Sequence, residues 1–211
     1  MQPLKTPLKA NAEGGLWSIA TEPERRKGAI MSKSTVPIAR PPEGETVYSE
    51  PRFELRRCQV SLSDGTAEAR GLMIHPGAVV LVPILEDGRI VMIRNRRWQV
   101  GYTLLELPAG TREPGEEPAR CARRELREET GYTTDNLQPL PAFFAAPGVS
   151  TEVMHPYLAT GLTHVGQSLA PDESIDVVRM APTSLRLALT DGRIIDGKTL
   201  AVLGRYFLAN P

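Results

Sequence analysis

Cysteine, net charge and long apolar runs are what this sequence lacks. Its two cysteines, Cys58 and Cys121, lie far apart and have no CxxC spacing. They can form neither a zinc site by themselves nor a disulfide framework, so we interpret them as two reduced thiols. The formal net charge is +0, which gives no support to nucleic-acid binding through phosphate neutralisation.

Membrane and export signals are also missing from the sequence. No apolar run approaches the roughly 20 residues of a transmembrane helix. The N-terminal stretch has no apolar core of about 7–15 residues, which a secretory signal requires. We therefore expect a cytoplasmic protein with neither a membrane nor a nucleic acid as its partner.

The composition that is present is that of an ordinary globular protein. Hydrophobic residues make up 41% and charged residues 24% of the 211 residues, which suits one medium domain. Residues 1–46 contain six prolines and few large apolar side chains, so they bury too little surface to offset their ordering entropy. We predict a flexible tail over residues 1–46, in which Met31 is an alternative start of translation, and one folded domain over residues 47–211.

The folded domain reads as short strands interrupted by helices. The predicted strands are Phe53–Leu62, Thr66–Met73, Ala78–Leu85, Arg89–Ile93, Thr103–Leu107, Ala142–Ala146, Pro156–Thr160 and Ile175–Met180. Prolines at the start and a glycine or Asp-Gly just past the end delimit two of the helices. The predicted helices are Pro118–Thr130, Pro182–Leu189 and Lys198–Leu208. This pattern favours an α+β or α/β/α sandwich.

One predicted helix carries an unusual set of carboxylates. Glu125, Glu128 and Glu129 stand at positions i, i+3 and i+4, so they project from one face. Like charges at this spacing destabilise a helix by a few tenths of a kcal/mol per pair, unless a hard divalent cation offsets the repulsion. The alternative is a solvated helix face whose charge is neutralised by the arginines of the same helix, Arg120, Arg123, Arg124 and Arg127.

The segment from Gly110 to Tyr132, GTREPGEEPARCARRELREETGY, resembles the Nudix box. That pattern is G-x5-E-x7-R-E-U-x-E-E-x-G-U, where U is an aliphatic residue. All specified positions match except the last, where Tyr132 replaces the aliphatic residue, a conservative change. The resemblance covers roughly residues 47–210 and implies the Nudix fold, a mixed β-sheet sandwiched between helices.

The resemblance also implies a metal site that takes Mg²⁺, with Mn²⁺ as a substitute. Its ligands would be the backbone carbonyl of Ala109 and the carboxylates of Glu125 and Glu129, with Glu128 ligating or lying beside the metals. Arg124 would hold the helix carboxylates in position, which suits a planar, bidentate guanidinium.

The remaining residues of the motif carry structural roles in this interpretation. Glu116 would brace the connection between the loop and the helix. Gly110 and Gly131 would be structural positions at the two ends of the motif.

Features outside the box resemble the ADP-ribose pyrophosphatase branch of the family. Arg97 lies nine residues before Glu106, and Pro147 lies sixteen residues after Gly131. The other matching segments are His75–Val79, Gly148–Glu152, Asp172-Glu173 and Asp196–Leu200. In this resemblance Arg97 binds a substrate phosphate, and Glu106 belongs to the substrate site. The alternative for Arg97 is a surface ion pair with Glu86 or Glu106.

The resemblance implies water attack on one phosphorus of a P–O–P bridge in a nucleoside-diphosphate sugar. ADP-ribose would give AMP and ribose 5-phosphate. We assign Glu152 as the general base because a loop glutamate with no evident partner is free to reach the water, and Glu128 is the alternative.

Two other functions remain open at this point. One is hydrolysis of GDP-mannose or another nucleoside-diphosphate sugar, and the other is a non-catalytic Nudix domain that senses a nucleotide. Members of the branch are usually homodimers with exchanged N-terminal strands. In such a dimer Arg57 would approach the substrate of the partner chain.

Overall fold

The computed structural model describes residues 41–211. Its strands are β1 (Gly44–Glu50), β2 (Phe53–Ser61), β3 (Ala67–Ile74), β4 (Ala78–Pro83), β5 (Ile90–Arg97), β6 (Tyr102–Glu106), β7 (Ala109–Thr111), β8 (Tyr132–Thr133), β9 (Asn136–Pro139), β10 (Phe143–Phe144), β11 (Val153–Thr160), β12 (Thr163–His164) and β13 (Ile175–Met180). Its helices are α1 (Pro118–Thr130), α2 (Pro182–Thr190) and α3 (Gly197–Ala209). Each strand and helix expected from the sequence overlaps one of these elements.

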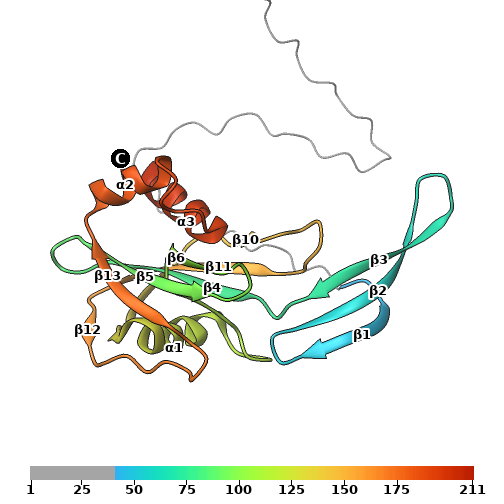
Figure 1. Ribbon diagram of the computed structural model, residues 1–211, viewed down its shortest axis with the longest axis horizontal. Coiled ribbons are helices and arrows are strands. Elements are labelled where there is room, and N and C mark those ends of the chain that lie inside the picture. Colours follow the sequence, from blue (N-terminus) through green and yellow to red (C-terminus); the bar gives the residue numbers. More distant parts are fainter. Residues whose placement is uncertain (1–40) are drawn as a thin grey trace, which may run out of the picture. The chain divides into compact units, whose positions relative to one another are not determined.

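The helices lie in two layers on opposite faces of the central strands, as Figure 1 shows, with α1 on one side and α2 and α3 on the other. Successive residues of the fully buried β4 point to opposite faces. Val80 and Val82 join a core cluster with residues of α2 and α3. Val79 and Leu81 join a second cluster with Leu126 of α1. The expected α+β fold with a sheet between helices is confirmed.

Strand β4 organises the end of the sheet that carries the functional residues. It pairs in parallel with β11, where Met154 lies opposite Ala78, and antiparallel with β7, where Gly110 lies opposite Val79. The parallel pairing requires a long crossover, which contains α1. Glu152, directly before β11, and Thr111, the last residue of β7, therefore lie at the same end of the sheet, where β4 begins.

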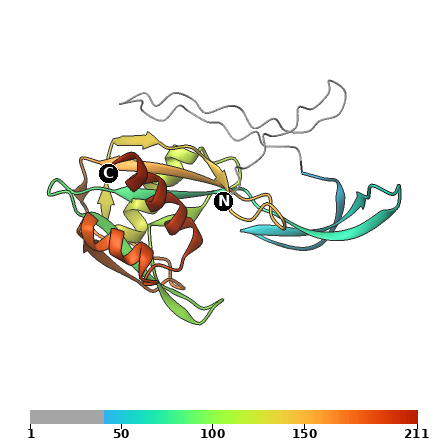
Figure 2. The ribbon, with the colours of Figure 1, turned by 90° about the horizontal axis from the view of Figure 1, so that it is seen from above.

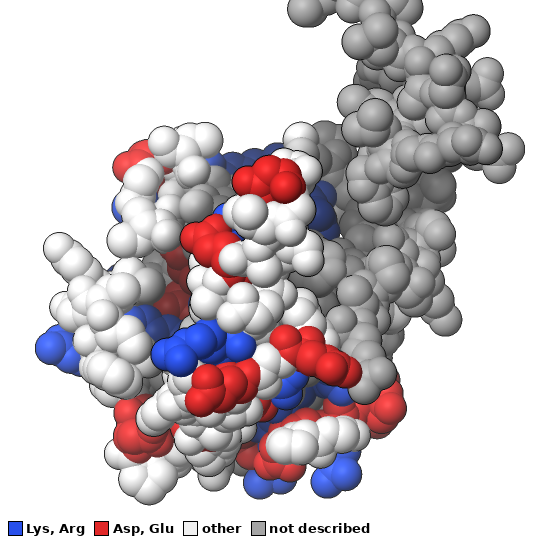
Figure 3. Space-filling model, turned by 90° about the vertical axis from the view of Figure 1, so that its right-hand side faces the viewer, with Lys and Arg blue, Asp and Glu red and all other residues white. Residues whose placement is uncertain are grey.

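Strands β1, β2 and β3 form a separate antiparallel sheet (Figure 2). Its link to the central strands is a backbone contact, in which the Met73 N–H donates to the Val149 carbonyl at 2.9 Å and the Thr151 N–H donates to the Met73 carbonyl at 3.0 Å. Charged residues of both signs are intermixed on the face seen in Figure 3. Within this sheet, Arg57 of β2 forms a cross-strand ion pair with Glu45 of β1 at 3.4 Å.

Strand β1 includes residues 44–46, which we expected in the tail. Residues 1–40 of the expected tail, with Met31, lie outside the described residues. Strand β1 begins at Gly44, which pairs with Cys58 of β2, and the boundary of the tail stays a prediction. The sequence GETVYSE has no regular apolar alternation and its side chains are mostly exposed. This strand therefore depends on its partner β2 and not on its own pattern.

Helix α1 has the bounds expected from its sequence because both ends are marked locally. Pro118 occupies the first turn, where its missing N–H has no helical partner to lose. Gly131 ends the helix with φ of 72°, and its N–H donates to the Arg127 carbonyl. A Cβ at residue 131 would also lie 2.8 Å from the backbone nitrogen of Gln167. Glycine is therefore required at 131 for its conformation and for space.

The strands β7, β8, β9 and β12 were not expected from the sequence. Each contains only two to four residues. Their pairing depends on partners distant in the chain, such as β8 with β12, so no local pattern predicts them.

None of the helices within residues 41–211 has the length and apolar character that a membrane span requires.

Candidate active site

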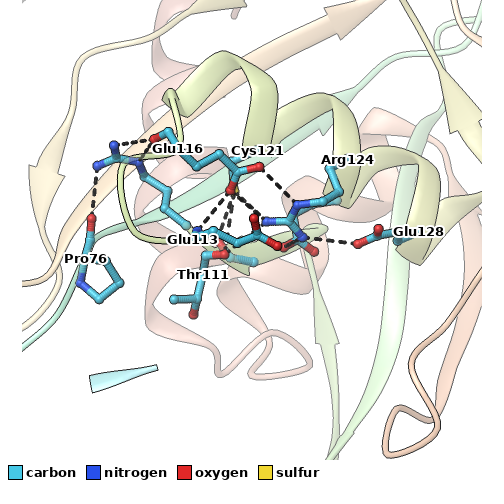
Figure 4. A network of polar contacts seen from close by, with 10 residues as sticks. Pro76, Thr111, Glu113, Glu116, Cys121, Arg124 and Glu128 are labelled. Atoms are coloured by element: carbon cyan, nitrogen blue, oxygen red, sulfur yellow. Dashed lines mark hydrogen bonds and ion pairs between the residues drawn. The ribbon is translucent and has the colours of Figure 1, made fainter. Parts of the chain in front are cut away.

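Arg124 lies at the centre of the polar network of α1 (Figure 4). Its Nε and Nη2 donate to the two carboxylate oxygens of Glu116, at 3.1 and 3.0 Å. Its Nη1 donates to Glu125 at 2.6 Å and to Glu128 at 3.1 Å. Nη2 also donates to the carbonyl of Thr111 at 3.2 Å. One guanidinium group thus holds three carboxylates and the end of β7 together.

The pKa values of these carboxylates differ because their surroundings differ. Hydrogen bonds from Arg124 lower the pKa of Glu116 to about 2. Burial raises the pKa of Glu125 to about 7, against the opposing charge of Arg124. Burial raises the pKa of Glu129 well above its usual range, and the charge of Glu125 adds to this. The buried pair, Glu125 and Glu129, therefore needs additional positive charge to be ionised at neutral pH.

The buried pair lies directly against strand β7. The Ala109 N–H donates to Glu129 Oε2 at 2.8 Å. At Gly110, a Cβ would collide with the carboxyl group of Glu125. Glycine is required there for the close approach of a side chain.

These groups fit a hard divalent cation. The carboxylates of Glu125, Glu128 and Glu129 lie near the main chain of Ala109, and such ions prefer several oxygen ligands. In the part of the chain from 41 to 211, no three acidic, histidine or cysteine side chains already surround one point. Arg124 Nη1 instead bonds both Glu125 and Glu128. With a cation bound, Glu125 and Glu128 would serve as its ligands in place of their bonds to Arg124, and Glu116 would remain bonded to Arg124.

The carboxylates open into a cavity of ≈ 810 Å³, a size that suits a small-molecule ligand. Acidic and basic side chains both line it. The acidic residues are Glu113, Glu125, Glu128, Glu129, Glu152, Asp172, Glu173 and Asp196, and the basic ones are Arg52, Arg96, Arg97, Arg112, Arg124 and Lys198. Such a lining complements a ligand that carries anionic groups together with bound cations.

Arg97 and Glu106 lie together, but only Arg97 faces the cavity. Arg97 Nε and Nη2 donate to Glu106 at 2.9 and 2.6 Å. These bonds raise the pKa of Arg97, with smaller contributions from the charges of Glu129 and Asp196. Glu106 is 0% exposed and is not among the residues that line the cavity. Glu106 therefore lies behind Arg97 and supports it, and its direct contact with a substrate stays a prediction.

Glu152 lines the cavity at the start of β11. Its Oε1 lies 3.8 Å from His75 Nδ1. That nitrogen accepts the Gly77 N–H at 3.0 Å, and burial lowers the pKa of His75. The neutral ring therefore has no Nδ1 proton to donate to Glu152.

Arg57 lies on β2, away from the cavity. Its side chain is 61% exposed and pairs with Glu45, and it is not part of the cavity lining. A contact between Arg57 and a substrate would need a second copy of the chain, and it stays a prediction.

Glu173 is a site residue to which the sequence assigned no role. It precedes β13 and lines the cavity. Burial is the main cause of the raised pKa of Glu125 and Glu129, and the charge of Glu173 makes a smaller contribution to both. The acidic dipeptide directly before a strand was the available signal, but nothing local shows what it faces.

Arg112 was also missed, because it acts on main-chain groups. Its Nε donates to the Glu116 carbonyl at 2.8 Å and its Nη1 to the Pro76 carbonyl at 3.0 Å. It thereby ties the loop before α1 to the start of β4 (Figure 4).

Comparison with known proteins identifies the family of this fold and site. The family model of the NUDIX domain matches residues 73–203. The chain belongs to the Nudix family. The match spans the carboxylate helix and the strands around it, so the expected fold is confirmed, and the chain is a Nudix hydrolase.

Two relatives and one solved structure are similar to this Nudix hydrolase. An ADP-ribose pyrophosphatase of Bacillus subtilis (strain 168) is 34% identical over 157 residues, which are 74% of this chain and 85% of that protein. A GDP-mannose pyrophosphatase of Yersinia enterocolitica is 34% identical over 138 residues, which are 60% of this chain and 71% of that protein. A solved structure described as an ADP compounds hydrolase superposes with a TM-score of 0.67 at 24% identity, over 87% of this chain and 98% of that one. This last likeness concerns the fold.

The close approach at Gly110 generates a prediction. In Gly110→Ala, the new methyl group would displace the Glu125 carboxyl group, and we expect the affinity for Mn²⁺ to fall about 10- to 100-fold. Electron paramagnetic resonance titration of free Mn²⁺ measures this. Gly71→Ala is the matched control, since it also lies in a strand and its Cβ would meet nothing within 4 Å. Equal Mn²⁺ affinity in Gly110→Ala and wild type would contradict the assignment.

The raised pKa of Glu125 predicts a pH dependence of stability without metal. The pKa is about 7 in the folded protein against an ordinary 4.5. Its contribution to stability is therefore fully present below pH 4.5 and is lost as pH rises through about 7. We expect the free energy of unfolding of wild type minus that of Glu125→Gln, measured with urea in EDTA, to fall across this window. A difference that does not change with pH would refute the shift.

Proposed function

We propose that this Nudix hydrolase cleaves the pyrophosphate bond of a nucleoside-diphosphate sugar in a Mg²⁺-dependent reaction. ADP-ribose is the proposed substrate, and AMP and ribose 5-phosphate are the products. The observation that carries the proposal is one cavity in which the helix carboxylates and the guanidinium of Arg97 face the same space. The first group suits cations and the second suits phosphate oxygens.

The metal-holding residues in this proposal are Glu125, Glu128 and Glu129, with the carbonyl of Ala109. When bound, Mg²⁺, or Mn²⁺ in its place, supplies Lewis-acid activation of the phosphate and of the attacking water. Arg124 keeps the carboxylates aligned between turnovers, since it bonds two of them as well as Glu116.

Arg97 is the proposed phosphate-binding residue. Its side chain is 33% exposed, and its carboxylate partner Glu106 fixes the plane of the guanidinium through two hydrogen bonds. A fixed cation beside the diphosphate stabilises the negative charge that grows on the phosphate as water attacks.

Glu152 is the proposed general base. Its side chain is 27% exposed and receives no proton from His75, so it can accept one from water. Glu128 is less suited because its carboxylate is one of the proposed metal-holding groups. Glu173 is a second candidate, because it lines the same cavity as Glu125 and Glu129.

The competing functions differ in their support. Hydrolysis of GDP-mannose has the support of the Yersinia enterocolitica relative, whose name gives that activity. A non-catalytic nucleotide sensor has less support, because Glu125, Glu128 and Glu129 are all retained. ADP-ribose is favoured over GDP-mannose because the Bacillus subtilis relative aligns over more of this chain.

A substrate panel tests the proposed function. Purified full-length protein with Mg²⁺ is given ADP-ribose, GDP-mannose, ADP-glucose and a nucleoside triphosphate at equal concentration. We expect kcat/KM to be highest for ADP-ribose, with AMP and ribose 5-phosphate as the only products by chromatography. A higher kcat/KM for GDP-mannose would make GDP-mannose the substrate in place of ADP-ribose. No turnover of any compound would refute the proposed hydrolysis.

The choice of base has its own test. In Glu152→Gln the carboxamide cannot accept the proton, so we expect kcat to fall about 10²- to 10⁴-fold, with KM little changed. Glu173→Gln and Glu128→Gln are measured in parallel. Full activity of Glu152→Gln together with a large loss in Glu173→Gln would transfer the role to Glu173.

A further inference from the structure

Lysine is rare in the part of the chain that carries the site. Lys198, in the first turn of α3, is the only lysine between residues 41 and 211, although arginine is frequent there. Its side chain is 17% exposed and lines the cavity. An ammonium group is a compact point charge, whereas the guanidinium of arginine is a planar fork.

The ammonium group of Lys198 lies between two carboxylates. Its Nζ donates to Glu106 at 2.6 Å and to Asp196 at 2.9 Å. Asp196 caps α3 by accepting the Thr199 N–H at 3.0 Å. The Thr199 hydroxyl in turn accepts the Leu107 N–H at 2.9 Å. The start of α3 is therefore bonded to the chain around the end of β6, which carries Glu106.

Glu106 forms ion pairs with two basic side chains, Arg97 and Lys198. It is 0% exposed, and a buried carboxylate is unfavourable unless cations or hydrogen bonds compensate it. If Arg97 were its only partner, Glu106 would cancel the positive charge of Arg97. Lys198 supplies a second positive charge, and the negative charge of Asp196 is itself offset by the N-terminal end of α3.

Arg97 keeps the N–H groups of Nη1 for a ligand in this arrangement. Its Nε and Nη2 bond Glu106, while its Nη1 has no hydrogen-bond partner within residues 41–211. Arg97 lines the same cavity as Glu125 and Glu129, the buried pair that would hold the metal. The free Nη1 is thus the donor placed for a phosphate oxygen.

We infer that Lys198 is a positioning residue for phosphate binding. It neutralises Glu106 and thereby leaves the charge and the Nη1 donor of Arg97 available to a diphosphate. This inference rests on the proposed function. It makes the C-terminal helix part of the phosphate site, although Lys198 acts through Glu106 and Arg97 and does not touch the reacting atoms.

The test begins with Lys198→Met, which keeps an unbranched side chain one atom shorter than lysine and removes its charge. We expect KM for ADP-ribose and Kd for its non-hydrolysable α,β-methylene analogue to rise about tenfold, with kcat changed less than about threefold. Arg205→Met is the control, because it removes one cation from the exposed side of the same helix and should change neither value. Lys198→Gln, which retains a hydrogen-bond donor, repeats the measurement if the methionine variant melts early.

A double-mutant cycle separates positioning from a merely structural role. In the Arg97→Met background, we expect Lys198→Met to change Kd for the methylene analogue by less than about twofold, because the residue through which it acts is gone. In the Glu106→Gln background, the loss caused by Lys198→Met should also shrink. The same tenfold loss in all backgrounds would mean that Lys198 acts independently of Arg97 and Glu106, through helix structure or a direct contact with the ligand, and would overturn the inference.

The cycle also separates this inference from the proposed function. If wild type hydrolyses ADP-ribose and Lys198→Met retains the wild-type KM and Kd, only the role of Lys198 is refuted. If wild type neither hydrolyses nor binds any diphosphate compound, the proposed function fails, and the positioning role fails with it.

Discussion

The burial of Glu125 and Glu129 between α1 and β7 is the constraint on which the rest of the site depends. Two carboxylates removed from water resist ionisation, so positive charge must be close to them. Arg124 supplies part of that charge, and Gly110 leaves the space that lets Glu125 approach the strand. The burial of the carboxylates therefore depends both on the charge of Arg124 and on the space at Gly110.

The sequence allows prediction of those features that local residues determine. Helix α1 could be delimited to the residue because Pro118 and Gly131 mark its ends. Strands β7 and β8 could not, since pairing with distant strands defines them. The motif residues were recognisable together because they lie within one segment of 23 residues. Glu173 and Lys198 reach the cavity from other parts of the chain, and the complete burial of Glu106 depends on packing that no spacing reveals.

The comparisons separate the residues that suit a diphosphate from those that would select one substrate over another. Relatives named for ADP-ribose and for GDP-mannose are each 34% identical to this chain. A diphosphate is common to both compounds, and the described site is rich in groups that suit it. The base and the sugar must be distinguished by other contacts, so the residues that fix the chemistry and those that fix the substrate need not be the same.

The single lysine of the domain has a consequence for chemical labelling. Amine-reactive reagents have one side-chain target between residues 41 and 211, and it lies in the wall of the cavity. Acylation of Lys198 would convert its ammonium group into a neutral amide and leave Glu106 with Arg97 as its only cation. The extent of labelling at this residue, read by mass spectrometry, would therefore report how well a ligand shields the cavity.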